Sequence, residues 1–135
     1  QEFSQRYAEA TEFEPIELRF QGKTNKQVSE GSFETYSAST FDIFQNKILD
    51  IEMKSYNLYR EMIDYGIARE CARFILSLNT QTTLFMSGNI RSWIFYLKLR
   101  TAPDTQKEHR LVAEEIKKIF IDNFPNISES LGWKT

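Results

Sequence analysis

The sequence predicts a helix-rich α+β domain, and three observations support this fold class. Beyond residue 40, apolar residues recur at helical spacing in four separate segments. Near the front, Ile16, Leu18 and Phe20 alternate with polar residues, which is the period of a half-buried strand. Residues 80–87 are rich in threonine and favour a second extended segment. We therefore expect one domain over residues 1–135, with helices dominating a few strands.

The front of the chain predicts a strand followed by a loop. Pro15 bounds the start of the strand over residues 16–20, because proline lacks the N–H that a ladder requires. Residues 22–40 are polar, rich in Ser, Thr and Lys, and have few apolar anchors. This composition is typical of a long surface loop.

The longest predicted helix covers residues 41–65, and a shorter one covers residues 68–78. Gly66 gives the first helix its stop, since glycine adopts the left-handed conformation that ends many helices. The apolar residues at helical spacing are Phe44, Ile48, Ile51, Tyr59, Met62 and Ile63. On the second helix, Glu70 and Arg73 are three residues apart and are placed to form an ion pair.

Two further helices are predicted on either side of Pro103. The first begins at the Gly88-Asn89 turn, and Arg100 continues the apolar stripe of Trp93 and Leu97. The second opens at Thr105-Gln106-Lys107-Glu108, a capping-box pattern, and ends before Pro125. The residues that we expect to face inward on it are Leu111, Val112, Ile116, Ile119 and Phe120.

Composition excludes several classes of function. Lys plus Arg number 17 against 19 Asp plus Glu, and this net charge of −2 argues against a general nucleic-acid binder. The lone Cys71 and lone His109 leave no material for a disulfide or a Cys/His metal site. There is no membrane-length apolar run and no signal peptide, so we expect an intracellular, cytoplasmic protein. Because the chain opens on Gln1, we expect its natural beginning to lie upstream.

Four arginines stand among apolar residues in the middle of the chain: Arg69, Arg73, Arg91 and Arg100. A guanidinium stays charged, so burial near a core requires an anionic or oxygen-rich partner. For any single arginine, Glu70 or a backbone carbonyl is the ordinary partner. Four in one region indicate an anion-binding site.

Several blocks match one family in order and spacing. They are Tyr59-x-x-Met62-x-x-x-Gly66-Ile67-x-Arg69-Glu70-x-Ala72-Arg73, Gly88-Asn89-x-Arg91-Ser92, Leu97-x-Leu99-Arg100 and Gln106-x-Glu108. The chain closely resembles the C-terminal part of the flavin-dependent thymidylate synthases, also called thymidylate synthase complementing proteins. Gln1 to Tyr7 resemble the end of the family signature, whose Arg-His-Arg would lie upstream. The resemblance implies an antiparallel sheet completed by upstream residues and a homotetramer with sites between subunits.

The resemblance also implies the reaction. Members methylate dUMP to dTMP with methylenetetrahydrofolate as the one-carbon donor, FAD as the hydride carrier and NADPH as the reductant. No nucleophilic side chain is required, and we expect Cys71, which has no histidine beside it, to be a core-packing residue. Without the Arg-His-Arg segment, we expect residues 1–135 alone to lack a complete site.

The resemblance assigns roles to particular residues. Arg100 is the catalytic residue, contacting the uracil ring and stabilising its ionised form. Arg73 reaches dUMP from a neighbouring subunit. The residues implied to hold the dUMP phosphate and sugar are Glu2, Phe3, Ser4, Gln5 and Arg6. Those implied to contact FAD are Glu2, Asn89, Ile90, Arg91 and Phe95.

Each role has an ordinary structural alternative. Arg100 would cap the last carbonyls of its helix, Arg73 would pair with Glu70, and Asn89 would be a helix N-cap. Phe95 departs from the family, which usually has His or Asn there, so only stacking or packing against a flavin is open to it. For the whole chain, the rivals are a non-catalytic nucleotide-binding or assembly module without flavin, and a structural helical domain whose arginines form salt bridges.

Overall fold

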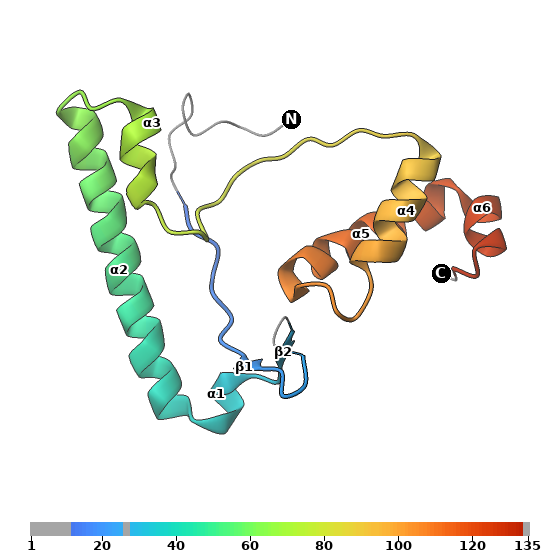
Figure 1. The fold of residues 1–135 in the computed structure, drawn as a ribbon, viewed down its shortest axis with the longest axis horizontal. Helices are drawn as coiled ribbons and strands as arrows, with labels where there is room; N and C mark the ends of the chain where they lie inside the picture. The colour runs from blue at the N-terminus through green and yellow to red at the C-terminus, as the bar shows by residue number, and fades with distance from the viewer. Residues whose placement is uncertain (1–11, 26–27, 134–135) are drawn as a thin grey trace. The chain divides into compact units, whose positions relative to one another are not determined.

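The computed structural model describes residues 12–25 and 28–133, and the chain divides into two compact units (Figure 1). The first unit comprises residues 1–19 and 32–86, and the second comprises residues 20–31 and 87–135. Helices dominate both, and a small antiparallel sheet accompanies them. The helix-rich α+β class predicted from the sequence is therefore confirmed, while the single domain over residues 1–135 stays a prediction.

The first unit is built on α2, Ala38–Asp64, the long helix predicted from residue 41. Gly66 ends it as expected, with a φ of 83°. The N–H of Gly66 donates to the Ile63 carbonyl at 2.8 Å, and the N–H of Ile67 donates to the Met62 carbonyl at 2.9 Å. These two bonds form a Schellman motif, which satisfies carbonyls that the helix leaves open. Tyr59, near this end, is fully buried.

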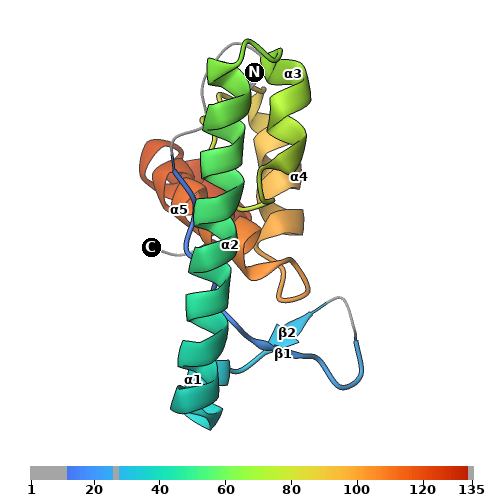
Figure 2. The same ribbon diagram turned by 90° about the vertical axis from the view of Figure 1, so that its left-hand side faces the viewer.

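A short helix, α1, Phe33–Tyr36, packs on the first turns of α2 (Figure 2). The ring of Phe33 meets the ring of Phe44 edge-on, 6.0 Å between centroids. The predicted loop over residues 22–40 is therefore wrong, since this segment holds a strand, α1 and the start of α2. The segment is mostly polar, but the contact of Phe33 with Phe44 packs a helical turn against α2.

The other end of α2 carries α3, Arg69–Ala72, and a 3₁₀ turn, η1, Arg73–Ile75. The predicted helix over residues 68–78 is thus shorter than expected. Local polar contacts hold the turn that follows it: the Thr80 hydroxyl donates to the Ser77 carbonyl at 2.7 Å, and the Ser77 hydroxyl donates to the Asn79 side chain at 2.5 Å. Such side chains compete with the helical hydrogen-bond ladder.

The extended segments differ from the predicted strands. In the first unit, Phe13 forms an antiparallel bridge with Thr80, so the predicted strand over residues 80–87 pairs at its first residue. In the second unit, β1, Phe20–Gln21, pairs with β2, Ser29–Glu30. Only the last residue of the predicted strand over 16–20 belongs to β1. Alternation identified extended backbone correctly, but it carries no information about where a partner strand lies.

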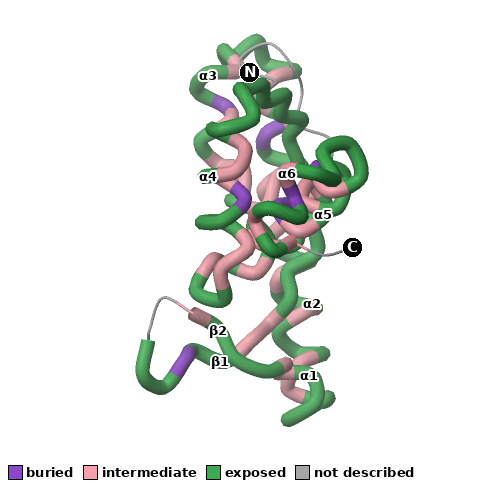
Figure 3. The backbone as a smooth tube through the Cα atoms, turned by 90° about the vertical axis from the view of Figure 1, so that its right-hand side faces the viewer, coloured by how far each residue is buried: buried purple, intermediate pink, exposed green. Residues whose placement is uncertain are grey.

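The second unit packs α4, Ile90–Arg100, against α5, Lys107–Asn123, and α5 against α6, Pro125–Ser130. Its core is small: Leu97 and Ala113 are fully buried and Phe120 is 6% exposed. Trp133 packs edge-on against Phe120, 5.7 Å between centroids. Among the residues that the structure describes, few are buried (Figure 3).

Two expectations for α5 are wrong. Leu111, Val112 and Ile119 are 50%, 57% and 63% exposed, so they do not face the core of this chain. The buried stripe contains Ala113 instead, whose small side chain permits close approach of α4 and α5. The capping box is also absent, because the Thr105 hydroxyl donates to the Leu99 carbonyl at 3.1 Å and Gln106 takes the N-cap position.

Within residues 12–25 and 28–133, no helix combines the length and the apolar character needed to cross a membrane.

Candidate functional site

Helix α4 and its N-cap carry five of the residues that the sequence assigns to the site: Asn89, Ile90, Arg91, Phe95 and Arg100. Asn89 is the N-cap, and its side-chain oxygen accepts from the Ser92 N–H at 2.8 Å. The N-cap interpretation is therefore confirmed. Capping uses only the Asn89 oxygen, which leaves its amide nitrogen and the first-turn N–H of Arg91 directed at the helix entrance, where anions bind favourably.

Arg91 and Phe95 form a cation–π pair one helical turn apart. The guanidinium carbon of Arg91 lies 5.8 Å from the centroid of the Phe95 ring. Phe95 is 62% exposed, so it is not a core residue of this chain. Together they present a flat, cationic and aromatic surface that suits a ligand carrying both a ring and phosphates.

Arg100 is the last residue of α4 and is exposed to solvent. Its guanidinium makes no hydrogen bond or ion pair within the part of the chain that the structure describes. The carbonyl of Leu97 is instead satisfied by Thr101, whose N–H donates at 3.0 Å and whose hydroxyl donates at 2.8 Å. The interpretation of Arg100 as a carbonyl cap is therefore wrong, and its charge is available to a ligand.

Arg91 and Arg100 lie on opposite sides of α4. At 3.6 residues per turn, Arg91 and Arg100 are about 180° apart around the axis and roughly 14 Å apart along it. Arg100 shares its side with Trp93 and buried Leu97, as the predicted stripe required, but projects beyond the core. Helix α4 therefore presents two separate cationic surfaces, one at Arg91 and one at Arg100.

The turn between α4 and α5, residues 101–106, directly follows Arg100 and is held by side chains from both helices. Arg110 donates to the Pro103 carbonyl at 3.0 Å and lies 3.5 Å from the Glu114 carboxylate. Across the turn, the Tyr96 hydroxyl and His109 Nε2 share a hydrogen bond of 3.1 Å. Sequence reasoning missed these residues. Two features of the sequence could have identified them. Tyr96 is four residues before Arg100, and His109 directly follows the Gln106-x-Glu108 block.

The remaining arginines belong to the first unit. Arg69 and Arg73 are half-buried, whereas Arg91 and Arg100 are exposed, so the expectation of four buried or half-buried arginines is wrong for Arg91 and Arg100. The guanidinium carbon of Arg73 lies 5.8 Å from the Phe74 ring centroid, and within the described residues it forms no ion pair with Glu70. The Glu70 alternative for Arg73 is thus wrong.

Cys71 is exposed, which corrects its expected role in core packing. The small buried residue of α3 is Ala72, its neighbour. Within residues 12–25 and 28–133, no group of His, Cys, Asp and Glu side chains is arranged to hold a metal ion. The predicted dUMP-binding segment, Glu2 to Arg6, lies outside the described residues.

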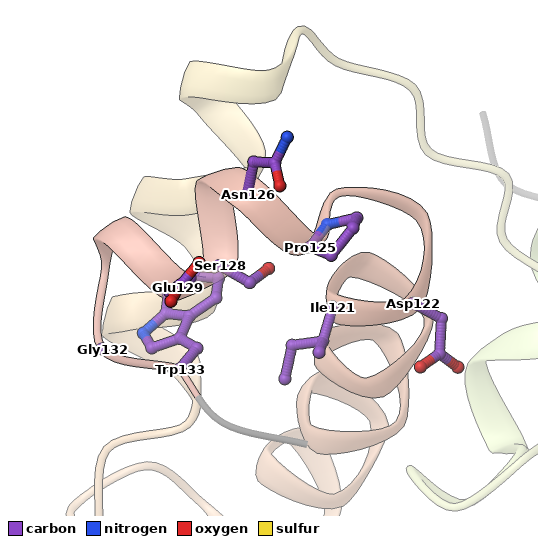
Figure 4. Close-up of a pocket in the computed structure, with 8 residues that line it drawn as sticks. All are labelled: Ile121, Asp122, Pro125, Asn126, Ser128, Glu129, Gly132 and Trp133. Atoms are coloured by element: carbon purple, nitrogen blue, oxygen red, sulfur yellow. The ribbon is translucent and has the colours of Figure 1, made fainter.

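A groove of about 670 Å³ lies at the end of the second unit, lined in part by Asp122, Ser128, Glu129 and Trp133 (Figure 4). Ser128 is 1% exposed, and its hydroxyl makes no hydrogen bond to any residue that the structure describes. Among the described residues, none that the sequence assigns to the site lines this groove. The groove is therefore separate from the α4 surfaces.

A family profile matches this chain over residues 1–126, and the family is described as thymidylate synthase complementing protein. The chain belongs to this family. The thymidylate synthase complementing family therefore accounts for the order of the Tyr59, Gly88 and Leu97 blocks along the sequence.

Individual relatives agree with the family assignment. A flavin-dependent thymidylate synthase from Synechocystis sp. is 45% identical over 133 residues, covering 98% of this chain and 60% of the relative. A probable flavin-dependent thymidylate synthase from Paramecium bursaria Chlorella virus 1 is 45% identical over 134 residues, covering 98% and 61%. The chain thus spans about three fifths of the length of these curated relatives.

A solved structure shares the fold. It is a UMP/dUMP methylase, PolB, from Streptomyces cacaoi, bound with 5-Br UMP. The TM-score is 0.76 at 28% sequence identity, and the match covers 90% of this chain and 57% of the methylase. A second structure of PolB, bound with 5-Br dUMP, gives a TM-score of 0.71.

Proposed function

We propose that the intact protein is a flavin-dependent thymidylate synthase, which methylates dUMP to dTMP. Methylenetetrahydrofolate is the one-carbon donor and NADPH is the reductant. The observation that carries this proposal is the family match over residues 1–126, in which relatives named for this activity are 45% identical. The nucleotide named in the PolB structures supports dUMP as the substrate class.

Arg100 is the catalytic residue in this proposal. An exposed guanidinium without a protein partner is free to lie against the uracil ring as the ring gains negative charge. A fixed cation lowers the free energy of that charged state more than that of the neutral ring, and such differential stabilisation raises the rate. Arg73 contacts dUMP from a neighbouring subunit, and Glu2 to Arg6 hold the phosphate and sugar.

The residues at the N-terminal end of α4 fit a flavin dinucleotide. Arg91 has the planar fork that binds phosphate bidentately, and the 62% exposed Phe95 ring offers a stacking surface. Asn89 retains an amide nitrogen as a donor beside the N–H groups of Ile90 and Arg91. We propose that these residues, with Glu2, hold FAD. When bound, FAD supplies hydride-transfer chemistry that no amino-acid side chain provides.

The two surfaces of α4 favour sites that are shared between copies. One pocket would have to wrap around the helix to touch both Arg91 and Arg100 of the same chain, since they are about 180° apart. In addition, α2 leaves several large apolar side chains exposed, which association with other copies would cover. Those more than 50% exposed are Ile43, Leu49, Ile51 and Met53. We propose a homotetramer whose sites lie between subunits.

The first experiment is to purify the intact protein, record its visible spectrum and assay dTMP formation from dUMP, methylenetetrahydrofolate and NADPH. We expect flavin absorbance and turnover. Arg100→Ala should lose turnover, while Lys98→Ala, which removes an exposed cation from the same helical turn, should not. Nucleotide binding without flavin would instead favour the non-catalytic binding module, and binding of neither would favour the structural domain.

A further inference from the structure

The position of Arg100 is set by its backbone. Its guanidinium has no hydrogen-bonding or ionic partner within the described residues, so no contact of its own side chain fixes its direction. It occupies the last position of α4, where helices ordinarily fray. Whatever holds this last turn therefore sets the backbone position from which the Arg100 side chain extends.

A side-chain pair ties the last turns of α4 to the first turn of α5. Tyr96 and Arg100 are four residues apart and share a side of α4, while His109 lies in the first turn of α5. The Tyr96 hydroxyl and His109 Nε2 lie 3.1 Å apart, and their ring centroids lie 5.8 Å apart. Trp93 meets the Tyr96 ring edge-on at 5.5 Å. The phenol is thus fixed on two sides.

The intervening turn is pinned independently of this pair. Thr105 donates to the Leu99 carbonyl at 3.1 Å, and Arg110 donates to the Pro103 carbonyl at 3.0 Å. The Tyr96–His109 bond is a further tie between α4 and α5, placed one helical turn before Arg100. Because the bond is exposed, it adds little to global stability.

We infer that Tyr96 and His109 are positioning residues for Arg100, and that their hydrogen bond aligns its guanidinium with the substrate ring. This inference rests on the proposed function, in which Arg100 acts on dUMP. The pair touches neither substrate nor cofactor in this account. Its effect reaches the reaction only through Arg100.

The first variant is Tyr96→Phe in the intact protein, which keeps the ring packing and removes the hydroxyl. We expect kcat to fall by on the order of tenfold, because small misplacements of a catalytic group lower rates strongly, while KM for dUMP changes little. His109→Ala should have the same effect, and His109→Gln, which retains hydrogen-bonding groups, should recover part of the rate. Tyr65→Phe, an exposed tyrosine of the first unit, serves as the control.

A double-mutant cycle separates positioning from general damage. If Tyr96 acts through Arg100, Tyr96→Phe causes no further loss of kcat in the Arg100→Ala background. Independent, multiplying losses of the two variants would overturn the inference. An unchanged kcat for Tyr96→Phe in the otherwise unaltered protein would overturn it as well.

A readout without turnover keeps the inference distinct from the proposed function. The N–H of Thr101 donates to the Leu97 carbonyl at 3.0 Å, so its hydrogen exchange reports on the last turn of α4. Faster exchange of this amide in Tyr96→Phe, at an unchanged thermal midpoint, would support the positioning role even if the protein made no dTMP. Unchanged exchange would overturn it, whereas absence of dTMP formation by the unaltered protein would refute only the proposed reaction.

Discussion

Replacing Arg100 by alanine should separate catalysis from stability. The side chain is exposed and makes no hydrogen bond or ion pair within the described residues, so its removal breaks no polar interaction there. What is lost is the favourable placement of a cation at the C-terminal end of α4. That interaction contributes about 0.3 to 1 kcal/mol to the free energy of unfolding. We therefore expect a thermal midpoint close to that of the unaltered protein.

The expected effect on rate is much larger. Removing one preorganised group that stabilises developing charge typically lowers kcat by ~10²-fold or more. A hundredfold loss corresponds to about 2.7 kcal/mol of transition-state stabilisation. The rate effect thus exceeds the stability effect severalfold, and this contrast marks a residue that acts on the substrate.

The assay is dTMP formation at saturating dUMP, with unfolding followed on the same samples. Arg100→Lys is the matched variant, because it keeps the charge and loses the planar fork, and it should give an intermediate rate. Equal kcat for Arg100→Ala and the unaltered protein would remove Arg100 from the catalytic role. Parallel losses of kcat and thermal midpoint would show that it is a structural residue.

Three other outcomes follow from the described geometry. Phe95→His should raise FAD affinity and shift the unfolding free energy by less than about 1 kcal/mol, because the ring is 62% exposed and loses mainly its contact with Arg91; a lower thermal midpoint with unchanged flavin occupancy would contradict this. Tyr59→Phe removes a buried hydroxyl that has no hydrogen-bond partner among the described residues, so urea unfolding should show equal or greater stability, and a loss would indicate a partner in the assembly. Gly66→Ala should cost about 1 to 2 kcal/mol, because the residue has a φ of 83°, and Gly66→Asn should cost less in the same urea titration.

The sequence predicted best those features that depend on neighbouring residues. Gly66 ends α2 and Asn89 caps α4 as expected, because both motifs are complete within one helical turn. Thr105 shows the limit of such reasoning. Its pattern matched a capping box, yet its hydroxyl found the Leu99 carbonyl across the turn, a partner that became available only when α4 and α5 packed together.

Burial was predicted less well. Apolar periodicity shows which face of a helix is apolar, but it does not show what covers that face. Leu111 and Ile119 follow helical spacing but are exposed in this chain, and the same holds for much of α2. For the candidate site, local blocks placed Asn89, Arg91 and Arg100 on one helix correctly. The separation of Arg91 from Arg100 by half a turn, and the contact of Tyr96 with His109, required the structure.

The exposed apolar side chains of α2 bear on how the stability of this protein should be measured. Ile51 and Met53 are 61% and 63% exposed, so in the proposed homotetramer much of their burial would come from other copies. Folding would then be coupled to association, and dilution would shift the equilibrium towards unfolded chains by mass action. A melting temperature would be meaningful only together with the protein concentration at which it was recorded.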